Sequence, residues 1–451
     1  MFGRFLVNSA SRLRFIGMGG YEMRYRRTIW LTSALLLASV VEAKAQYYGP
    51  TAANFLNYPA TPQALAMGEA GVSIVANSAM SVSANPGLLG MQSLDNSLNI
   101  GTSLVHYIDS NLPYGVTAVH NYSFLVSAVT YGTRLNSIWH DLPFKAGVGV
   151  GYSYEESTLP FAPEQPSVSG YITDYANSFT VGLGVDYFLR VGLGYSMELI
   201  KNKNPFSAFM PNIDQPAENF GAVLQIPVLH LLYGTRQRPL LIGKNIYPSL
   251  DVTAGYALRN VGGYVIKTPN YQLPLARQAS LGWNWKFSLR SRMRGYDWKW
   301  FSFTWAREAT SEPFNLDSVS AGIGPNGVAN YDYLLSYRNG LGAFGSWNNL
   351  VLGIPTTTAT SIKGWQIGVG GFFYLRGGSI TYSGSPALVT SGWGARLDGL
   401  VKLVVLLHGL NPNASFTHFV LDHLDLRFDY YGSESGLFPG QPFESLDLVV
   451  R

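Results

Sequence analysis

Apolar residues alternate with small or polar residues along much of the chain. From Phe179 to Tyr187 every odd position is apolar, and the same holds from Val191 to Leu199. A period of two places one set of side chains on each face of a β-strand. The alternation recurs in further stretches, at 148–154, 281–288 and 424–430. The pattern therefore predicts an all-β chain whose strands each carry one apolar face.

The alternation and its interruptions delimit about fourteen antiparallel strands. They are expected at residues 98–108, 121–131, 144–155, 178–188, 189–200, 219–230, 248–259, 277–289, 296–306, 331–338, 364–376, 393–406, 418–430 and 443–451. The last strand can pair with the first and close the sheet. Segments rich in Pro, Asn, Ser and Gly are expected to be extracellular loops, at 156–177, 201–218, 260–276, 307–330 and 339–362.

Alternation alone fits both a membrane barrel and a soluble β-sandwich, because each has one apolar face. Three features favour the barrel. The predicted strands have roughly the 9–12 residues of tilted membrane strands, and aromatic residues such as Trp298 and Trp300 crowd their ends. Glycine dominates the smaller face, where it allows another segment to approach closely. The run from Leu400 to Leu407 is far shorter than the about 20 residues of a membrane helix, so a closed barrel remains.

The first 45 residues have the features of a secretory signal peptide. Met23 to Arg27 is basic, Thr28 to Val41 is apolar, and Ala43-Lys44-Ala45 is a small-residue cleavage site. The basic region indicates Met23 as the true start. A single N-terminal membrane anchor is the alternative. After cleavage the mature chain would begin near Gln46, and its predicted location is the outer membrane of a Gram-negative bacterium.

Composition narrows the classes of function. Only 13% of the residues are charged and 14% are aromatic, which excludes a disordered chain. The absence of cysteine excludes disulfide scaffolds, zinc–thiolate sites and iron–sulfur clusters. A scattered net charge of +4 gives no sign of nucleic-acid binding. We expect neither a cofactor nor enzymatic activity, since P-loop, GxSxG and HExxH motifs are absent.

Residues 46–97 lack the alternation and precede the first clear strand. They contain Leu65-Ala66-Met67-Gly68-Glu69-Ala70-Gly71-Val72-Ser73 and, further on, Ser81-Val82-Ser83-Ala84-Asn85-Pro86-Gly87-Leu88-Leu89. These two motifs resemble the N-terminal segment of the FadL-like outer-membrane barrels, especially the PorV/PorQ branch. There a Met-Gly-x-Ala-Gly-Val stretch precedes Asn-Pro-Ala-Gly/Lys-Leu. Gly87 stands here where that branch usually has alanine.

The resemblance implies a small hatch, residues 46–97, inside a barrel formed by residues 98–451. In FadL-type transporters the hatch shifts and hydrophobic substrates leave sideways through a gap in the wall. The hatch-motif residues are Met67, Gly68, Gly71, Asn85, Pro86 and Gly87. The first two glycines permit close packing or a positive φ, and Asn85 before proline is restricted to extended backbone. A simple Asn-Pro-Gly turn is the alternative interpretation.

Four polar residues near the C-terminus share one face of the predicted strand 418–430: His423, Asp425, Arg427 and Asp429. We expect them to point into the lumen, because barrel interiors are routinely polar. An acid–base site on the lumen wall is the alternative. His418 and His423 would face opposite sides of the strand, so no metal site is expected.

Three functions from different classes fit these observations. The first is passive uptake of a hydrophobic small molecule, past inward aromatic residues such as Phe372 and Tyr374. The second is a PorV-like scaffold or shuttle of type IX secretion, whose long loops bind an exported protein. A barrel enzyme is the third, and the missing motifs rank it last. We expect a monomeric barrel embedded in outer-membrane lipid.

Overall fold

The computed structural model describes most of the chain from residue 53 onward. The described residues are 53–57, 61–109, 120–137, 142–161, 170–203, 214–233, 246–268, 271–275, 277–293, 296–311, 315–323, 329–336, 341–408, 415–432 and 442–451. The predicted signal peptide at 1–45 and the start of the predicted hatch at 46–52 lie outside them.

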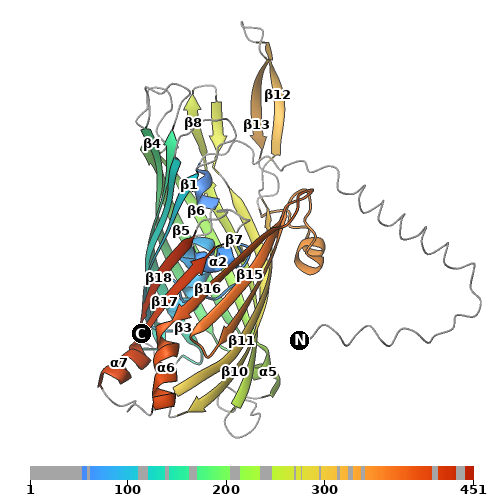
Figure 1. Cartoon of the computed structure of the whole chain (residues 1–451). Coiled ribbons are helices and arrows are strands. Elements are labelled where there is room, and N and C mark those ends of the chain that lie inside the picture. The colour runs from blue at the N-terminus through green and yellow to red at the C-terminus, as the bar shows by residue number, and fades with distance from the viewer. Residues whose placement is uncertain are drawn as a thin grey trace, which may run out of the picture. The chain divides into compact units, whose positions relative to one another are not determined.

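Fourteen strands form one closed antiparallel barrel (Figure 1). In chain order they are β1 (Ser97–Asp109), β2 (His120–Arg134), β3 (Lys145–Phe161), β4 (Gly170–Asp186), β5 (Arg190–Lys203), β6 (Asp214–Pro227), β7 (Ile246–Gly262), β10 (Gln278–Met293), β11 (Tyr296–Ser311), β14 (Thr360–Val369), β15 (Phe373–Thr381), β16 (Leu388–Arg396), β17 (Leu424–Tyr431) and β18 (Phe443–Val450). The last strand closes the ring on β1, from Leu98 opposite Val450 to Val105 opposite Phe443. The predicted closed barrel of fourteen antiparallel strands is confirmed.

The barrel is apolar outside and polar inside. On β4 the exposed fractions of Phe179, Val181 and Leu183 are 59%, 54% and 58%, whereas Ser178 and Thr180 between them are buried. Such an exterior is the surface that the hydrocarbon core of a bilayer accepts. In the described part of the chain, no helix combines the length and the hydropathy needed to cross a membrane.

Two predicted strands are wrong in ways that leave the strand count unchanged. The predicted strand 364–376 is the hairpin β14–β15, because Gly370 and Gly371 adopt φ values of +63° and +75° and turn the chain back. The predicted strand 331–338 exists as β13 (Ala329–Ser336), but it pairs with β12 (Asn315–Ile323) in a hairpin separate from the barrel. A second separate hairpin joins β8 (Tyr264–Thr268) to β9 (Tyr271–Pro274).

Parts of three further predicted strands are helical. The predicted strand 393–406 leaves the barrel after Arg396 and continues as α6 (Leu397–His408). The predicted strand 418–430 begins as α7 (Ser415–His423), and the predicted strand 219–230 ends in α5 (Val228–Tyr233). Short apolar runs do not distinguish a strand from a helix by composition, which explains these errors. The remaining short helical turns are η2 (Leu135–Ser137) and η3 (Trp347–Leu352).

Several predicted loops are shorter than expected because the strands continue into them. Strands β3 and β4 have 17 residues each, so much of the predicted loop 156–177 is strand. Strand β11 likewise continues to Ser311, into the predicted loop 307–330. The polar residues in these extensions therefore face the lumen or the barrel exterior with a strand period rather than lying in loops.

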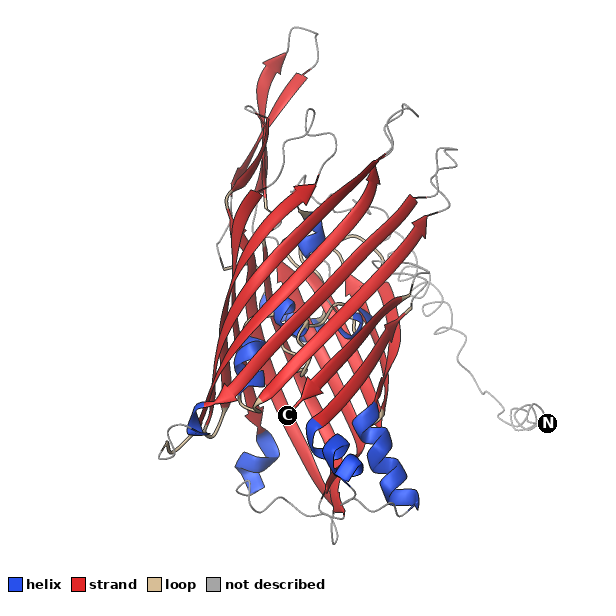
Figure 2. Ribbon diagram, turned by 90° about the vertical axis from the view of Figure 1, so that its left-hand side faces the viewer, coloured by secondary structure: helices blue, strands red, loops and turns tan. Residues whose placement is uncertain are grey.

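The described part of the hatch lies within the ring of strands (Figure 2). It contains η1 (Asn54–Asn57), α2 (Pro62–Ala66), α3 (Ser81–Ala84) and α4 (Gly87–Ser93). Helix α4 contacts β2 to β6, and helix α2 contacts β15 to β18. Two different parts of the wall thus hold the two ends of the hatch.

Candidate functional site

Helix α4 of the hatch packs directly on backbone in one part of the wall. There glycines of neighbouring strands lie opposite one another, as Gly184 does to Gly192, and form a flat, side-chain-free surface. A Cβ atom at Gly184 would overlap the carbonyl oxygen of Gly90 in α4, and one at Gly90 would overlap that of Leu183. We call this surface the glycine wall. Its members are Gly147, Gly149, Gly182, Gly184, Gly192, Gly194 and Gly221.

Asn85 joins the start of α4 to the wall. It has extended backbone, with φ −156° and ψ 107°, as its position before proline predicts. Its side-chain Nδ2 donates to the carbonyl oxygens of Val72 (2.7 Å) and Ala222 on β6 (3.2 Å). Its Oδ1 accepts the backbone N–H of Gly87 at 2.9 Å, which satisfies a free donor of the helix. The Asn85-Pro86-Gly87 motif therefore starts a docked helix and is more than an isolated turn.

The Met67-Gly68 motif lies at the other end of the hatch. Gly68 has φ +70°, and its N–H donates to Thr390 Oγ1 on β16 at 2.9 Å. The hydroxyl of Thr390 in turn donates to the carbonyl oxygen of Ala66 at 3.1 Å. A Cβ at Gly68 would lie 2.6 Å from the carbonyl oxygen of Lys363, so both the conformation and the space require glycine.

Glu308 on β11 holds the middle of the hatch. One carboxylate oxygen, Oε2, accepts the backbone N–H groups of Gly71 at 2.9 Å and of Val72 at 3.1 Å. Sequence reasoning missed this residue because it placed 307–330 in a loop. The signal was present, since small or polar residues recur at every second position from Ser302 to Glu308.

Three of the four polar residues predicted near the C-terminus lie on the buried face of β17. Asp425, Arg427 and Asp429 are 1%, 5% and 8% exposed. His423 does not share their face, because α7 ends at this residue and the strand begins after it. Its exposed ring places Nδ1 2.9 Å from the carbonyl oxygen of Arg451. The prediction that His423 belongs to this lumen group is wrong.

The charges on β17 are paired. Arg427 Nε donates to Asp425 Oδ2 at 2.8 Å, and Arg427 Nη1 donates to the carbonyl oxygen of Asn77 in the hatch at 3.0 Å. Arg376 Nη1 lies 2.7 Å from Asp429 Oδ1. Because both aspartates are held by arginines, the geometry favours a structural role over acid–base chemistry.

Two further contacts to the hatch were missed. Ser78 Oγ donates to Asp447 Oδ1 on β18 at 2.7 Å, and Gln63 Nε2 donates to Gln366 Oε1 on β14 at 3.3 Å. Side chains on β11, β14, β16, β17 and β18 thus form hydrogen bonds with the hatch, and we call them together the polar wall. Its members are Glu308, Gln366, Thr390, Arg427 and Asp447.

Glu69 is a partly buried carboxyl group in the hatch itself. It lines a cavity of about 30 Å³ together with Glu308 and Arg259. Desolvation and, to a smaller extent, the nearby Glu308 raise the pKa of Glu69, Arg259 lowers it, and the net value is about 8. Glu69 is therefore mostly protonated at neutral pH, so the hatch carries one negative charge fewer than its sequence indicates.

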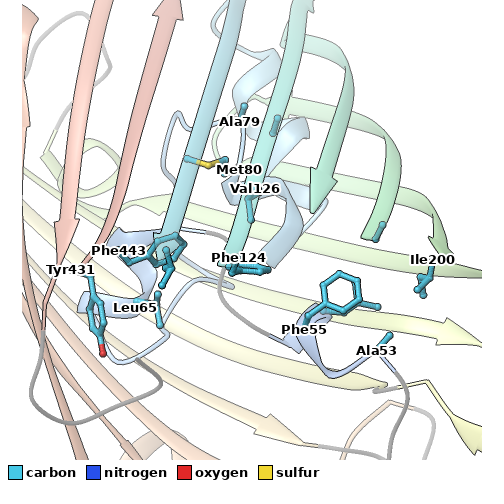
Figure 3. Packing of buried hydrophobic residues seen from close by; sticks show 14 of the residues in the cluster. Ala53, Phe55, Leu65, Ala79, Met80, Phe124, Val126, Ile200, Tyr431 and Phe443 are labelled. Atoms are coloured by element: carbon cyan, nitrogen blue, oxygen red, sulfur yellow. The ribbon is translucent and has the colours of Figure 1, made fainter. Parts of the chain in front are cut away.

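An apolar cluster fills another part of the space between hatch and wall (Figure 3). The rings of Phe124 on β2 and Phe443 on β18 lie 6.2 Å apart, centroid to centroid. The hatch contributes Phe55, Leu65, Ala79 and Met80, and the wall contributes Val105, Phe124, Val126, Ile200, Tyr431 and Phe443. Inward apolar side chains on a barrel wall are unusual, because lumens are generally polar.

Small cavities lie between the hatch and the wall. Three of them have volumes of about 30, 20 and 10 Å³, enough for single water molecules. Among the described residues, no three His, Asp or Glu side chains converge as ligands for a metal ion. The structure defines a closed antiparallel β-barrel of fourteen strands, and the described residues that precede β1 lie inside it.

Comparisons with known proteins give matches among solved structures only. No protein-family model matches the chain, and no curated protein does. Among solved structures, the chain is similar to the TodX deltaS2S3 mutant monoaromatic hydrocarbon channel, with TM-score 0.42, 11% identity and coverage of 87% of this chain and 97% of that one. It is also similar to the Pseudomonas putida toluene transporter TodX, with TM-score 0.38, 8% identity and coverage of 86% and 96%.

The translocator domain of the autotransporter NalP from Neisseria meningitidis gives TM-score 0.31, 10% identity and coverage of 79% of this chain and 87% of that one. Likeness at this level does not assign the chain to a family or give it an activity.

Proposed function

We propose that the protein is an outer-membrane channel that admits a hydrophobic small molecule when the hatch shifts. The apolar cluster between hatch and wall carries this proposal. If Leu65 and Met80 move away, the inward faces of Phe124, Val126 and Phe443 form an apolar surface inside an otherwise polar lumen. Such a surface favours an apolar solute over a polar one by the free energy of burying apolar area.

The resemblance of the hatch motifs to FadL-like barrels supports the same function. In that group a shifting hatch precedes lateral release of a hydrophobic substrate. Here Gly68 and Asn85 make hydrogen bonds that hold the hatch in place, and Met67 packs in an apolar cluster with wall residues. A shift of these residues would uncover the apolar surface.

A reversible lock on the hatch tests the proposal. The chain has no cysteine, so Ser78→Cys with Asp447→Cys places two unique thiols where a hatch residue meets β18. A short thiol crosslinker with a cleavable disulfide should stop uptake of a hydrophobic dye into proteoliposomes, and reduction should restore it. The two single-cysteine variants are the controls.

Two results would overturn the proposal that the protein is a channel. One is dye uptake into wild-type proteoliposomes no faster than into protein-free vesicles. The other is uptake that continues unchanged after the crosslink is confirmed by mass spectrometry.

A second function, a scaffold or shuttle for an exported protein as in the PorV/PorQ branch, is supported by the hairpin β12–β13. This hairpin forms its own sheet and is not needed to close the barrel. Deletion of 315–336 should then abolish co-purification with a secreted protein identified by mass spectrometry. Deletion of the other separate hairpin, 264–274, is the matched control, and equal loss in both variants would reject a specific docking site.

A further inference from the structure

A cavity of about 810 Å³ occupies the lumen beneath the hatch. Its lining includes the hatch from Ile74 to Asn77 and inward residues of the strands from Arg190 on β5 to Arg396 on β16. Figure 1 shows α5, α6 and the C-terminus at this end of the barrel. The short turn between β14 and β15 lies here too, and short turns mark the periplasmic end of such barrels. We call this cavity the basic vestibule.

Cationic side chains dominate the basic vestibule. Its described lining holds six Lys or Arg residues and two Asp residues: Arg190, Lys286, Arg290, Arg292, Lys299 and Arg396 against Asp95 and Asp251. Two of these cations are in ion pairs, Arg190 with Asp186 at 3.2 Å and Arg290 with Asp297 at 3.3 Å.

Three of the other cations lack a close carboxylate partner. Within the described chain, no ion pair of 4.0 Å or less involves Lys286, Lys299 or Arg396. Lys299 is repelled by Lys286, Arg290 and Arg396, and Asp398 offsets this repulsion only in part. Lys286 is attracted by Asp251, and Arg396 by Asp398, Asp425 and Asp429, none of them within 4.0 Å. Like charges in a half-enclosed space create a positive potential that concentrates anions from solution.

The side chains around these cations are arranged for polar recognition. The guanidinium of Arg396 lies 4.9 Å from the ring centre of Tyr374, which fixes its orientation. Asn284 and Gln366 add neutral polar groups to the lining. The volume lies within the roughly 300–1,000 Å³ typical of small-molecule sites.

We propose that the basic vestibule binds a soluble multivalent anion that carries phosphate groups or several carboxylate groups. Arg396 supplies the planar fork that pairs with two oxygens of such a group, and Lys286 and Lys299 supply point charges. The ligand enters from the aqueous phase, because the lining faces the lumen and the barrel wall separates it from lipid headgroups. This site is independent of the proposed channel, since it lies below the hatch and is polar.

Calorimetric titration of the purified protein in non-ionic detergent tests the site. The probes are inorganic triphosphate and citrate. Wild-type protein should bind at least one of them with a stoichiometry of one, and Lys286→Gln with Lys299→Gln should weaken binding about tenfold or more, because hydrogen bonds to charged groups are lost. Lys201→Gln with Lys203→Gln is the matched control: it removes two charges from the opposite end of β5, outside the vestibule, and should leave the affinity unchanged.

The control variant distinguishes binding at a specific site from nonspecific attraction of the anion to positive charge. Equal weakening in the two double variants would overturn the proposal, and so would the absence of saturable binding of either anion to wild-type protein. Folding of each variant is checked by the heat-dependent gel mobility of the barrel. Should the glutamine pair fail to fold, Arg396→Gln takes its place with the same expected loss. Dye uptake reports on the channel separately, so either proposal can fail alone.

Discussion

The glycine wall and the polar wall hold the hatch by different physical means. On the glycine wall, α4 touches strand backbone, and the fit depends on the absence of any Cβ atom. On the polar wall, side chains such as Glu308 and Thr390 bond the backbone of the hatch across the lumen. Steric contact fails abruptly when one atom is added, whereas a hydrogen bond to protein can be exchanged for one to water. We therefore expect release of the hatch to begin at the polar wall.

The largest effect is expected from Gly90→Val. Any Cβ at this position overlaps the Leu183 carbonyl oxygen, which is strand backbone and has no room to move. We expect α4 to leave the glycine wall, at a cost of about 3 kcal/mol or more in docking of the hatch. Limited proteolysis of the hatch in the otherwise folded barrel measures this.

Gly263→Val is the control for that substitution, because the nearest atom to a Cβ at Gly263 is 3.6 Å away in a flexible side chain. Unchanged protection of the hatch in Gly90→Val would show that the glycine wall does not hold it.

The next effect is expected from Glu308→Ala. This change leaves the buried N–H groups of Gly71 and Val72 without their acceptor, at a cost of about 1–3 kcal/mol. Hydrogen exchange at these two amides should accelerate, while Glu308→Gln, which keeps an oxygen acceptor, should change them less. Exchange as slow as in Glu444→Ala, which removes an exposed carboxylate from β18, would refute the role of Glu308.

A smaller effect is expected from Asn85→Ala. The acceptor of the Gly87 N–H and two bonds to carbonyl oxygens are lost, at a cost of about 1 kcal/mol for the bond to Gly87. Because the glycine wall still holds α4, the hatch should loosen without leaving. Asn348→Ala, at an exposed position outside the hatch, is the control, and equal exchange in the two variants would argue against a role of Asn85 in docking α4.

The smallest effect is expected from Glu69→Gln. At low pH this variant should dock the hatch as well as wild type does, and it should differ only in how proteolysis of the hatch depends on pH. The pKa of Glu69 is raised from 4.5 to about 8 in the folded state, so the protonated form favours the docked hatch. Its contribution is complete below 4.5 and is lost as the pH rises through about 8. Proteolysis of the hatch should accelerate across this range in wild type and less so in Glu69→Gln. Parallel curves for the two proteins would contradict this assignment.

The strand period was sufficient to predict the strands and their two faces, and strand length, aromatic strand ends and glycine content were needed to choose a barrel over a sandwich. Phe179, Val181 and Leu183 alternate with small residues in the sequence and are exposed in the structure, because the direction of a side chain on a strand is fixed by its position alone. Asn85 is extended for an equally local reason, the clash between a proline ring and the residue before it.

Where the hydrophobic pattern fits both a strand and another structure, the contacts of the segment with adjacent strands decided which one formed. Leu400 to Leu407 is apolar enough for a strand, yet it forms helix α6 outside the closed sheet. The chain between Trp365 and Tyr374 reads as one strand, and a two-glycine turn divides it. In both cases the local sequence allows two structures of similar energy, and pairing with adjacent strands selects one.

The sequence by itself determined that this chain forms strands with one apolar and one small or polar face, since the side chains of a strand alternate with a period of two. Strand length and aromatic strand ends then favoured the closed barrel with its apolar face outward. The tertiary structure decided what holds the hatch. Gly71 and Glu308 are 237 positions apart, and no local rule relates them. The same applies to the basic vestibule, where Lys286, Lys299 and Arg396 come together because the ring closes. Contacts across a lumen depend on the register of every strand between them, so they exist only once the whole barrel has formed.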